Sequence, residues 1–523
     1  MYNLVLLVFI ICVTQYEAAR IFGVFPTPSI SHQVTFRPLI QELVKKGHEV
    51  VVLTTDPAFT EEERPKNLTE IDVHDVSYHV WVENFKSNMD TSKKSSLKNQ
   101  IRLIYEMMTQ VFEMQMNLDV MQEIIKKKIK PFDLILVEAY MLPALGFSHV
   151  FKVPVIQMSS FLPVYSDIRN IGAHDHPLLY PALGRQKLDN LSLLDKVKEL
   201  YNHYSMDSDT RKAETFFDES VKRIFGPDVP DLSELYNNID MLFLNTFPIW
   251  DSNRPVPPSV QYLGGIHMKP VKELPEDLKS YLDSSKHGVV YVSFGTNVNA
   301  SALPPEKIQM MINVLSRSPY DVLWKWDKDE LPGQTKNIRI SKWLPQSDLL
   351  RHPKIKFFIT QGGLQSTDEA IVAGVPLLGI PMLGDQWYNV AMYERHKIGV
   401  KMELEDLEES NFKEAIHALT KDESYRQNII RLRSIVYDQP QTPLERAVWW
   451  TEHVLRHGGA RHLRSPAANL PWTVYYEVEL VAYALLVVTS AISVFVFLAW
   501  KVRRVVHLLL MSNLKSRNVK FDE

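Results

Sequence analysis

The sequence predicts an α/β protein of two Rossmann-like domains followed by a membrane-spanning helix. Two stretches, at 20–54 and 289–326, each read as strand, loop, helix and strand, which is how a parallel βαβ unit begins. A proline-rich stretch at 247–286 lies between them and is expected to link the two domains. The chain has 523 residues, which is enough for two domains, each with its own core.

The first half is expected to open with a strand at 20–25, a loop at 26–33, a helix at Val34–Lys46 and a second strand at 48–54. Three more apolar runs of strand length follow, separated by longer helical stretches. They lie at 134–137, 153–158 and 241–244. The last of these is expected to be the final strand of this half.

The most informative stretch of the second half, at 343–387, reads WLPQSDLLRHPKIKFFITQGGLQSTDEAIVAGVPLLGIPMLGDQW. Its centre is a short apolar strand at 356–360, the pair Gly362-Gly363 and a helix at 364–373. The glycines let the backbone approach a ligand, and the first amides and the dipole of the helix face negative charge. This arrangement predicts an anion cradle at the carboxyl ends of the strands, where open α/β sheets bind ligands.

Both ends of the chain have membrane-related sequences. An apolar run that ends in small residues predicts a cleaved signal peptide at 1–19. After a juxtamembrane segment at 461–479, residues 480–500 carry no charge and are long enough to cross a bilayer, which takes about 20 residues. Lysine and arginine then recur in the tail at 501–523, so the tail is expected to be cytoplasmic and the bulk of the protein lumenal.

Composition excludes several classes of function. A net charge of −4 gives no basic footprint for nucleic-acid binding. The single cysteine, Cys12, lies in the N-terminal apolar run, so a mature chain has no thiol for a disulfide, a zinc site or a nucleophile. The histidines lack metal-ligand spacing, and a polar turn explains the DxD sequence at Asp327 and Asp329. No metal site is therefore predicted.

The stretch at 343–387 resembles the donor-binding signature of the UDP-glycosyltransferases, which move a sugar from a UDP-sugar to a small lipophilic acceptor. The matching pattern is WxPQxDLLxHP, a strand, (H/Q)GGxxSTxEA, GVPxxGIP and GDQ. The resemblance covers nearly the whole chain and is closest in character to arthropod members. It implies the GT-B fold, in which an acceptor-binding domain at 20–246 and a UDP-sugar-binding domain at 287–460, with its return helix, face one cleft.

The resemblance also implies a catalytic base at His32, in the loop after the first strand. An imidazole there would take a proton from the acceptor hydroxyl. Relatives orient this histidine with an aspartate, and the matching residue here is Glu138, which is one methylene longer. Asp133, at the start of the same strand, is expected at its far end. Without the resemblance, His32 is a surface residue and Glu138 a salt-bridge or capping residue.

Donor contacts follow from the same resemblance. Trp343 would stack on uracil, and Gln346 would form hydrogen bonds with the edge of that base. The alternative for Trp343 is a core residue. Glu369 would accept hydrogen bonds from the ribose hydroxyls. Gln361 stands where most relatives have histidine, and its amide donates to phosphate without carrying charge. Further donor contacts are expected from Ser293, Gly295, Thr296, Gly363, Gln365, Ser366, Asp385 and Gln386. The last two would bind the sugar hydroxyls.

The predicted function is inverting transfer of a hexose from a UDP-sugar to a hydroxyl of a small lipophilic acceptor, a detoxification-type conjugation. Glucose is favoured over glucuronic acid, and no cofactor or metal is expected beside the UDP-sugar co-substrate. A Met-rich helical stretch at 101–129 either lines a greasy acceptor pocket or packs in the core. The alternative is a non-catalytic lumenal binding protein for lipophiles or nucleotide-sugars, which Gln361 and Glu138 favour.

The predicted location, by resemblance, is the endoplasmic reticulum membrane, as a single-pass type I protein that contacts lipid through its C-terminal helix. Glycosylation is expected at the sequons Asn67 and Asn190, but not at Asn299, which lies beside a ligand loop. The sequence leaves the acceptor and the oligomeric state, including a homo-oligomer, open.

Overall fold

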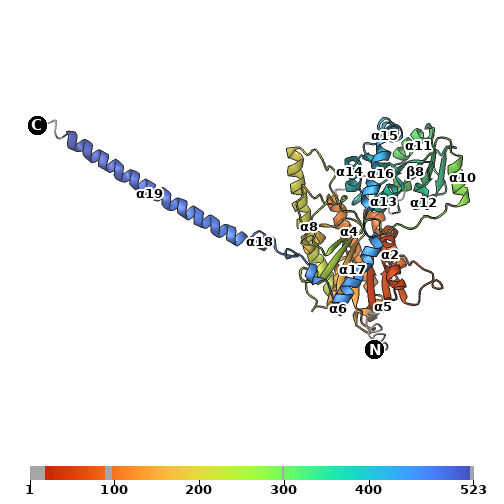
Figure 1. Cartoon of the computed structure of the whole chain (residues 1–523), viewed down its shortest axis with the longest axis horizontal. Coiled ribbons are helices and arrows are strands. Elements are labelled where there is room, and N and C mark those ends of the chain that lie inside the picture. The colour runs from red at the N-terminus through yellow and green to blue at the C-terminus, as the bar shows by residue number, and fades with distance from the viewer. Residues whose placement is uncertain (1–17, 89–96, 297–299, 519–523) are drawn as a thin grey trace, which may run out of the picture. The chain divides into compact units, whose positions relative to one another are not determined.

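Figure 1 shows the computed structural model of the chain, which describes residues 18–88, 97–296 and 300–518. The chain divides into two compact units, Met1–Ala468 and Asn469–Glu523. Most of the expected signal peptide and the sequon Asn299 lie outside the described residues.

A seven-stranded parallel sheet forms the first half of the large unit, with the order β3-β2-β1-β4-β5-β6-β7. Its strands are β1 (Arg20–Phe25), β2 (Glu49–Thr54), β3 (Leu68–Asp72), β4 (Leu134–Glu138), β5 (Val155–Ser159), β6 (Ile239–Leu244) and β7 (Val260–Tyr262). Strands β4, β5 and β6 are buried along their whole length, because helices cover both faces of a parallel sheet. This burial explains why their sequences are continuous apolar runs.

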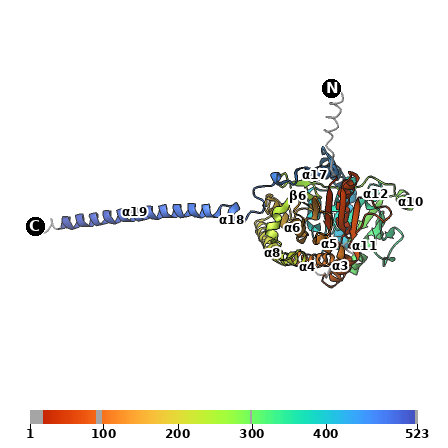
Figure 2. The same cartoon turned by 90° about the horizontal axis from the view of Figure 1, so that it is seen from below.

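Helices cover the two faces of this sheet unequally (Figure 2). On one face, α2 (Ile30–Lys45) and α17 (Pro443–His457) pack together over the strands. The opposite face is covered mainly by α4 (Leu97–Met116), α5 (Asp119–Ile125), α6 (Gly146–Phe151) and α8 (Leu193–Phe225). The remaining helices of this half are α3 (His74–Asn88), η1 (Leu142–Leu145), α7 (Tyr165–Ile171), α9 (Leu232–Leu235) and η2 (Tyr236–Asn238).

A six-stranded parallel sheet forms the second half, with the order β10-β9-β8-β11-β12-β13. Its strands are β8 (Val289–Ser293), β9 (Asp321–Lys325), β10 (Ile338–Ser341), β11 (Ile355–Thr360), β12 (Leu377–Gly379) and β13 (Gly399–Lys401). Its helices are α10 (Glu276–Ser284), η3 (Ala300–Ala302), α11 (Pro305–Ser316), α12 (Gln346–Leu350), α13 (Leu364–Ala373), α14 (Gln386–Arg395), α15 (Glu409–Lys421) and α16 (Ser424–Tyr437). Two sheets of this kind form the predicted pair of Rossmann-like domains.

The structure differs from the sequence-based expectation in three places. The expected linker at 247–286 contains β7, which pairs with β6, so Met241–Leu244 is not the last strand of the first sheet. It also contains α10, whose Leu278 and Leu282 belong to the core of the second half. Helix α2 begins at Ile30 rather than Val34, because Ser29, which directly follows Pro28, occupies the N-cap position with an extended backbone.

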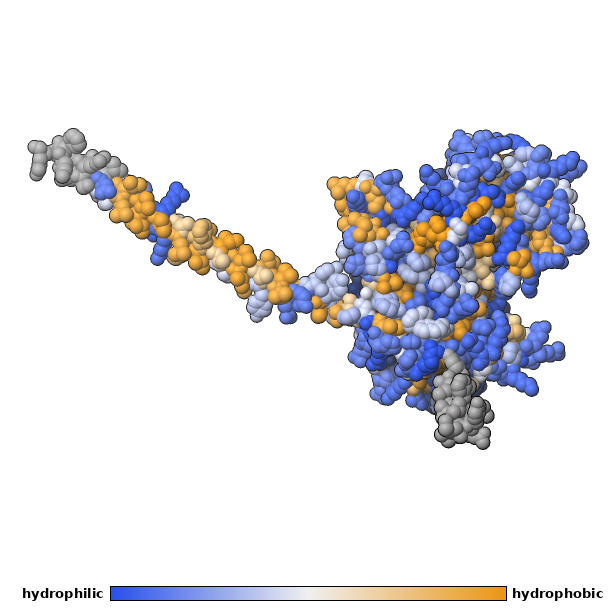
Figure 3. Space-filling view, in the orientation of Figure 1, coloured by the Kyte–Doolittle hydropathy of each residue, from blue (hydrophilic) through white to orange (hydrophobic). Residues whose placement is uncertain are grey.

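The large unit ends after η4 (Arg461–Leu463), and the small unit contains α18 (Trp472–Tyr475) and the long α19 (Val478–Asn518). Within α19, residues 478–513 include an 18-residue stretch with a mean hydropathy of 2.5, and none of that stretch is buried. Figure 3 shows α19 as a rod covered mainly by hydrophobic side chains. The helix thus includes the predicted span at 480–500 and continues into the basic residues of the predicted tail, which begins at 501.

Candidate active site

His32 and Glu138 meet at the carboxyl edge of the first sheet. The Nδ1 atom of His32 lies 2.7 Å from Oε1 of Glu138, and the two side chains are 14% and 0% exposed. His32 lies in the first turn of α2, where its own amide donates to the carbonyl of Ser29. Glu138 is the last residue of β4, the strand next to β1. The expectation that His32 lies in a loop is corrected, and its predicted partner is the residue it contacts.

Neighbouring side chains fix the imidazole plane. The hydroxyl of Ser160 lies 3.0 Å from Nδ1 of His32. The rings of Tyr140 and Phe161 meet the imidazole nearly at right angles, with centroids 5.8 and 5.6 Å away. These contacts engage Nδ1 and leave Nε2 as the nitrogen that would accept a proton from a bound hydroxyl. Asp133 lies at the other end of β4, where its carboxylate accepts from the amide of Arg20.

The predicted anion cradle is formed by β11, two glycines and α13. Gly362 has φ +89°, and a Cβ there would come within 2.4 Å of Val390, so only glycine fits. Gly363 is the N-cap of α13, and the first intrahelical bond runs from the amide of Thr367 to the carbonyl of Gly363. The preceding amides of the first turn therefore have no partner within the helix and are available to a diphosphate.

Three predicted donor residues form one hydrogen-bonded group beside this cradle. The amide nitrogen of Gln346 donates to Ser366 at 2.9 Å and to Glu369 at 2.7 Å, while its oxygen accepts from Tyr291. Burial raises the pKa of Glu369 to about 7, although the Gln346 bond opposes that shift. An ionised Glu369 presents a carboxylate that suits ribose hydroxyls.

A second group surrounds Gly295, at the carboxyl end of β8. Gly295 has φ +80°, and a Cβ there would lie 2.3 Å from the side-chain amide nitrogen of Gln361, which directly follows the adjacent strand β11. On the other side, Nζ of Lys325 donates to the carbonyl of Gly295 at 2.9 Å and lies 5.0 Å from the centre of the Trp343 ring. Ser293 is buried at the strand end, and the neighbouring Thr296 is exposed.

Sequence reasoning missed Lys325. Burial lowers the pKa of this lysine, and no carboxylate pairs with it among the described residues. It therefore brings positive charge to a site where Gln361 brings none. The signal was available, because Lys325 lies at the end of a predicted strand, and the carboxyl ends of parallel strands are where such sheets bind ligands. Trp343 is 66% exposed, which excludes the alternative that it is a core residue.

Asp385 and Gln386 begin α14 but differ in what they contact. The carboxylate of Asp385 accepts from Asn389 at 2.7 Å, and burial raises its pKa to about 6, against the opposing charge of His32. His32 is thus close enough to influence Asp385 across the two halves. The side-chain oxygen of Gln386 accepts hydrogen bonds from the backbone amides of Met382 and Leu383. This oxygen therefore stabilises the loop before α14.

Direct contacts join the two halves around this site. Gln365 of α13 donates to the carbonyl of Ser160 at 3.0 Å, beside His32. Arg395, at the end of α14, makes a bidentate ion pair with Asp189 of the first half. Trp250, in the connection between the halves, donates to Asn389 at 2.9 Å. The predicted base and Gln365 of the predicted donor site therefore lie together where the two halves meet.

A family model described as "UDP-glucoronosyl and UDP-glucosyl transferase" matches residues 23–510. The chain is 36% identical to the ecdysteroid UDP-glucosyltransferase of Spodoptera littoralis nuclear polyhedrosis virus over 497 residues, which are 90% of this chain and 95% of the relative. The chain belongs to the UDP-glycosyltransferase family. It is also 30% identical over 492 residues to human UDP-glucuronosyltransferase 2B15, covering 90% of this chain and 91% of the relative.

Solved structures place this UDP-glycosyltransferase in the GT-B fold, which confirms the predicted fold class. The calicheamicin glycosyltransferase CalG4 has a TM-score of 0.58 at 16% identity, covering 84% of this chain and 99% of that structure. A UDP-glucose:anthocyanidin 3-O-glucosyltransferase in complex with UDP has a TM-score of 0.57 at 16% identity, covering 84% and 100%. Membership of the family shows that the protein is an enzyme that uses a UDP-sugar donor.

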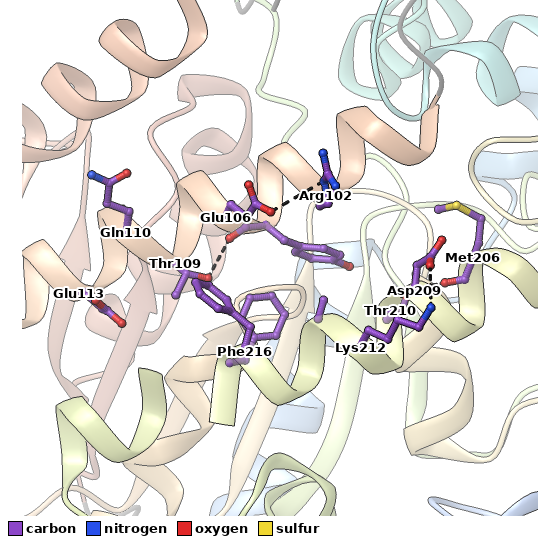
Figure 4. Close-up of a pocket in the computed structure, with 13 residues that line it drawn as sticks. Arg102, Glu106, Thr109, Gln110, Glu113, Met206, Asp209, Thr210, Lys212 and Phe216 are labelled. Carbon is purple, nitrogen blue, oxygen red and sulfur yellow. Dashed lines mark hydrogen bonds and ion pairs between the residues drawn. The ribbon is translucent and has the colours of Figure 1, made fainter. Parts of the chain in front are cut away.

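A cavity of about 690 Å³ lies elsewhere in the UDP-glycosyltransferase, between α4 and α8 (Figure 4). Polar side chains of α4, among them Arg102 and Glu106, face Met206 and Phe216 of α8 across it. The methionines Met107 and Met108 of α4 are instead buried in the core. Met107 and Met108 therefore pack in the core and do not line this cavity. None of the predicted site residues lines it either.

Polar contacts also account for the DxD sequence and one sequon of the enzyme. Asp327 accepts from the amide and hydroxyl of Ser301, while Asp329 pairs with Lys342. The amide nitrogen of Asn67 donates to two backbone carbonyls at 2.8 Å, which a glycan on that nitrogen would disturb. Asn190 is exposed. Glycosylation at both positions stays a prediction.

Proposed function

We propose that this enzyme transfers glucose, with inversion, from UDP-glucose to a hydroxyl of a small lipophilic acceptor. The observation that carries the proposal is the His32–Glu138 pair, 2.7 Å apart, facing donor-site residues of the second half. The pair has the geometry of a base with its orienting carboxylate. Within the cleft, such a base would act on a hydroxyl lying against the donor sugar.

In the proposed reaction, Nε2 of His32 takes the proton of the acceptor hydroxyl as the oxygen attacks the anomeric carbon. The bond between that carbon and the diphosphate oxygen breaks, and its electron pair leaves with UDP. Glu138 stabilises the imidazolium that forms. The amides at the start of α13 and the cation of Lys325 would stabilise the charge that develops on the diphosphate.

Charge at Asp385 supports a neutral sugar. Among the described residues, no lysine or arginine forms an ion pair with the Asp385 carboxyl, whose side-chain partner is Asn389. A glucuronate carboxylate placed beside Asp385 would meet like charge without a fixed counter-charge. Ecdysteroid UDP-glucosyltransferases, at 35–36% identity, are also nearer in sequence than the glucuronosyltransferase at 30%. Both observations favour UDP-glucose over UDP-glucuronate.

Helix α19 supports the proposed class of acceptor and the proposed location. A helix of this length and hydropathy is long enough to anchor the enzyme in a bilayer, where lipophilic acceptors concentrate. We place the catalytic unit in the lumen of the endoplasmic reticulum, with the basic end of the helix on the cytoplasmic side. Hydroxylated steroids and simple phenols are the acceptor classes to test.

The test is UDP release by the full-length enzyme in detergent, with UDP-glucose or UDP-glucuronate and a phenol or an ecdysteroid as acceptor. We expect turnover with UDP-glucose and a loss of at least about 10²-fold in His32→Ala, in line with the usual contribution of general-base catalysis. The matched control is His417→Ala, an exposed histidine of α15. Equal activity in His32→Ala would refute the assignment of the base, and faster turnover of UDP-glucuronate would refute the donor.

A further inference from the structure

Behind Glu138, two buried hydroxyl groups continue the hydrogen bonds of the catalytic pair. The hydroxyl of Thr27 donates to Oε2 of Glu138 at 2.5 Å and lies 2.6 Å from the hydroxyl of Tyr140. Thr27 is 3% exposed and Tyr140 is 8% exposed. Glu138 therefore uses one carboxylate oxygen for His32 and the other for Thr27.

The number of protons fixes the direction of these bonds. Thr27 has one hydroxyl hydrogen, which it gives to Glu138, so the hydrogen between Thr27 and Tyr140 comes from Tyr140. A carboxylate only accepts, so the hydrogen between Glu138 and His32 lies on Nδ1. The order Tyr140, Thr27, Glu138, His32 thus selects the tautomer whose Nε2 carries the lone pair.

We propose that Thr27 and Tyr140 are positioning residues for the His32 base: they hold the second oxygen of Glu138 and so fix the imidazole in its reactive tautomer. The proposal rests on the proposed function of His32. It also explains how a glutamate serves where relatives are expected to have aspartate. The extra methylene adds a rotatable bond, and anchoring Oε2 removes the freedom that this bond introduces.

Both hydroxyls are themselves held in place. The carbonyl oxygen of Thr27 accepts from the side chains of Gln33, at 3.0 Å, and Thr55, at 2.9 Å. The Tyr140 ring stacks on Phe161 with centroids 5.7 Å apart, and both rings meet the imidazole edge. Burial raises the pKa of Tyr140 well above its usual value, so its hydroxyl stays a donor. Hydrogen bonds in such a series strengthen one another.

The experiment compares Thr27→Val, Thr27→Ser and Tyr140→Phe in the full-length enzyme, with UDP-glucose and a phenol. Removing a hydrogen bond to a charged group predicts a fall in kcat of about 10- to 100-fold in Thr27→Val, with little change in the donor KM. Thr27→Ser keeps the hydroxyl and should recover most of the activity. Tyr140→Phe removes a neutral bond and should lose about 2- to 10-fold.

Two readouts separate positioning from a structural role. The hydrogen bond from Thr27 stabilises the Glu138 carboxylate most when His32 is neutral. Loss of this hydrogen bond therefore favours the inactive form of the pair, in which His32 is protonated. The acid limb of the kcat/KM profile of Thr27→Val should therefore move to higher pH. An acidic phenol such as 4-nitrophenol needs less help from a base than an aliphatic alcohol. The defect of Thr27→Val should accordingly be smaller with 4-nitrophenol.

The matched control is Thr451→Val in α17, which likewise removes a buried threonine hydroxyl, but one that donates to the backbone carbonyl of Ala447 rather than to a site residue. It should leave kcat and the pH profile unchanged. Thermal unfolding shows whether each variant is folded. If folded Thr27→Val has the wild-type kcat and pH profile while His32→Ala is inactive, the positioning proposal is wrong and the proposed function stands. If His32→Ala keeps full activity, the proposed function itself fails.

Discussion

At the scale of single residues, the ionisation of Glu369 is the feature most open to measurement. Burial raises its pKa to about 7, and only the carboxylate form accepts hydrogen bonds from both ribose hydroxyls. Because the protonated form predominates below that value, UDP-glucose should bind about tenfold more tightly at pH 8 than at pH 6. UDP-glucose suits the measurement, since its diphosphate is esterified at both ends and does not titrate in this range.

Isothermal titration across this pH range gives the dissociation constants for wild type and Glu369→Gln. The glutamine has the same shape and cannot ionise, so its affinity should be nearly independent of pH. A pH dependence that persists in Glu369→Gln would assign the titration to another group.

Lys325 allows a second residue-scale prediction. Its ammonium group, 2.9 Å from the carbonyl of Gly295, is not neutralised by a carboxylate among the described residues. Lys325→Met should weaken UDP binding about 10- to 100-fold, in line with a charged hydrogen bond, and uridine binding much less. Lys325→Arg should stay near wild type, and Lys328→Met, at an exposed site just after β9, is the control. Equal weakening of UDP and uridine would mean that Lys325 acts through the Trp343 ring.

The residue scale also shows the limits of sequence reasoning. Glu138 was expected to pair with His32, and the two side chains are in contact, although their roles remain predictions. Thr27 and Tyr140 gave no signal, because neither belongs to a motif and they approach each other only when β1 and β4 pair. Gln386 was assigned to the sugar from its motif, but local loop bonds that a motif does not encode engage its oxygen.

At the scale of elements, the turn between β11 and α13 combines two demands on one glycine. Gly362 needs a positive φ and also lies against Val390. Gly362→Ala should therefore cost about 2–5 kcal/mol in the free energy of unfolding, from backbone strain and overpacking together. The control is Gly458→Ala, where φ is +62° with open space, and the backbone term alone predicts about 1–2 kcal/mol. Chemical denaturation measures both, and equal losses would contradict the packing argument.

Elements with long apolar runs were predicted well, and short or locally polar ones were not. The strands at 134–137 and 356–360 were evident, because burial on both faces leaves continuous apolar sequence. β7, at Val260–Tyr262, was hidden among prolines and has only three residues at the sheet edge. Its pairing with β6 depends on tertiary contacts that composition does not report.

At the scale of the whole molecule, every described site residue belongs to the large unit, Met1–Ala468. A protein that ends at Ala468 should therefore remain folded and bind UDP within about twofold of the full chain, since binding energy follows the contacts made. It should also stay in solution when membranes are sedimented, because it lacks α19. Loss of UDP binding in the shortened protein would show that the C-terminal segment supports the site.

The path of α17 has a consequence for exchanging parts between relatives. Its Ala447, Val448 and Val454 lie in the same core as Phe36 and Leu39 of α2, although the chain builds the entire second sheet in between. Consider a hybrid with the N-terminal half of one enzyme and all later residues of another. In that hybrid, the α17 of the second enzyme would pack against the α2 of the first. Hybrids designed to change acceptor preference should therefore take both the N-terminal half and residues 443–457 from the same enzyme. Two separate segments of the chain are then exchanged instead of one.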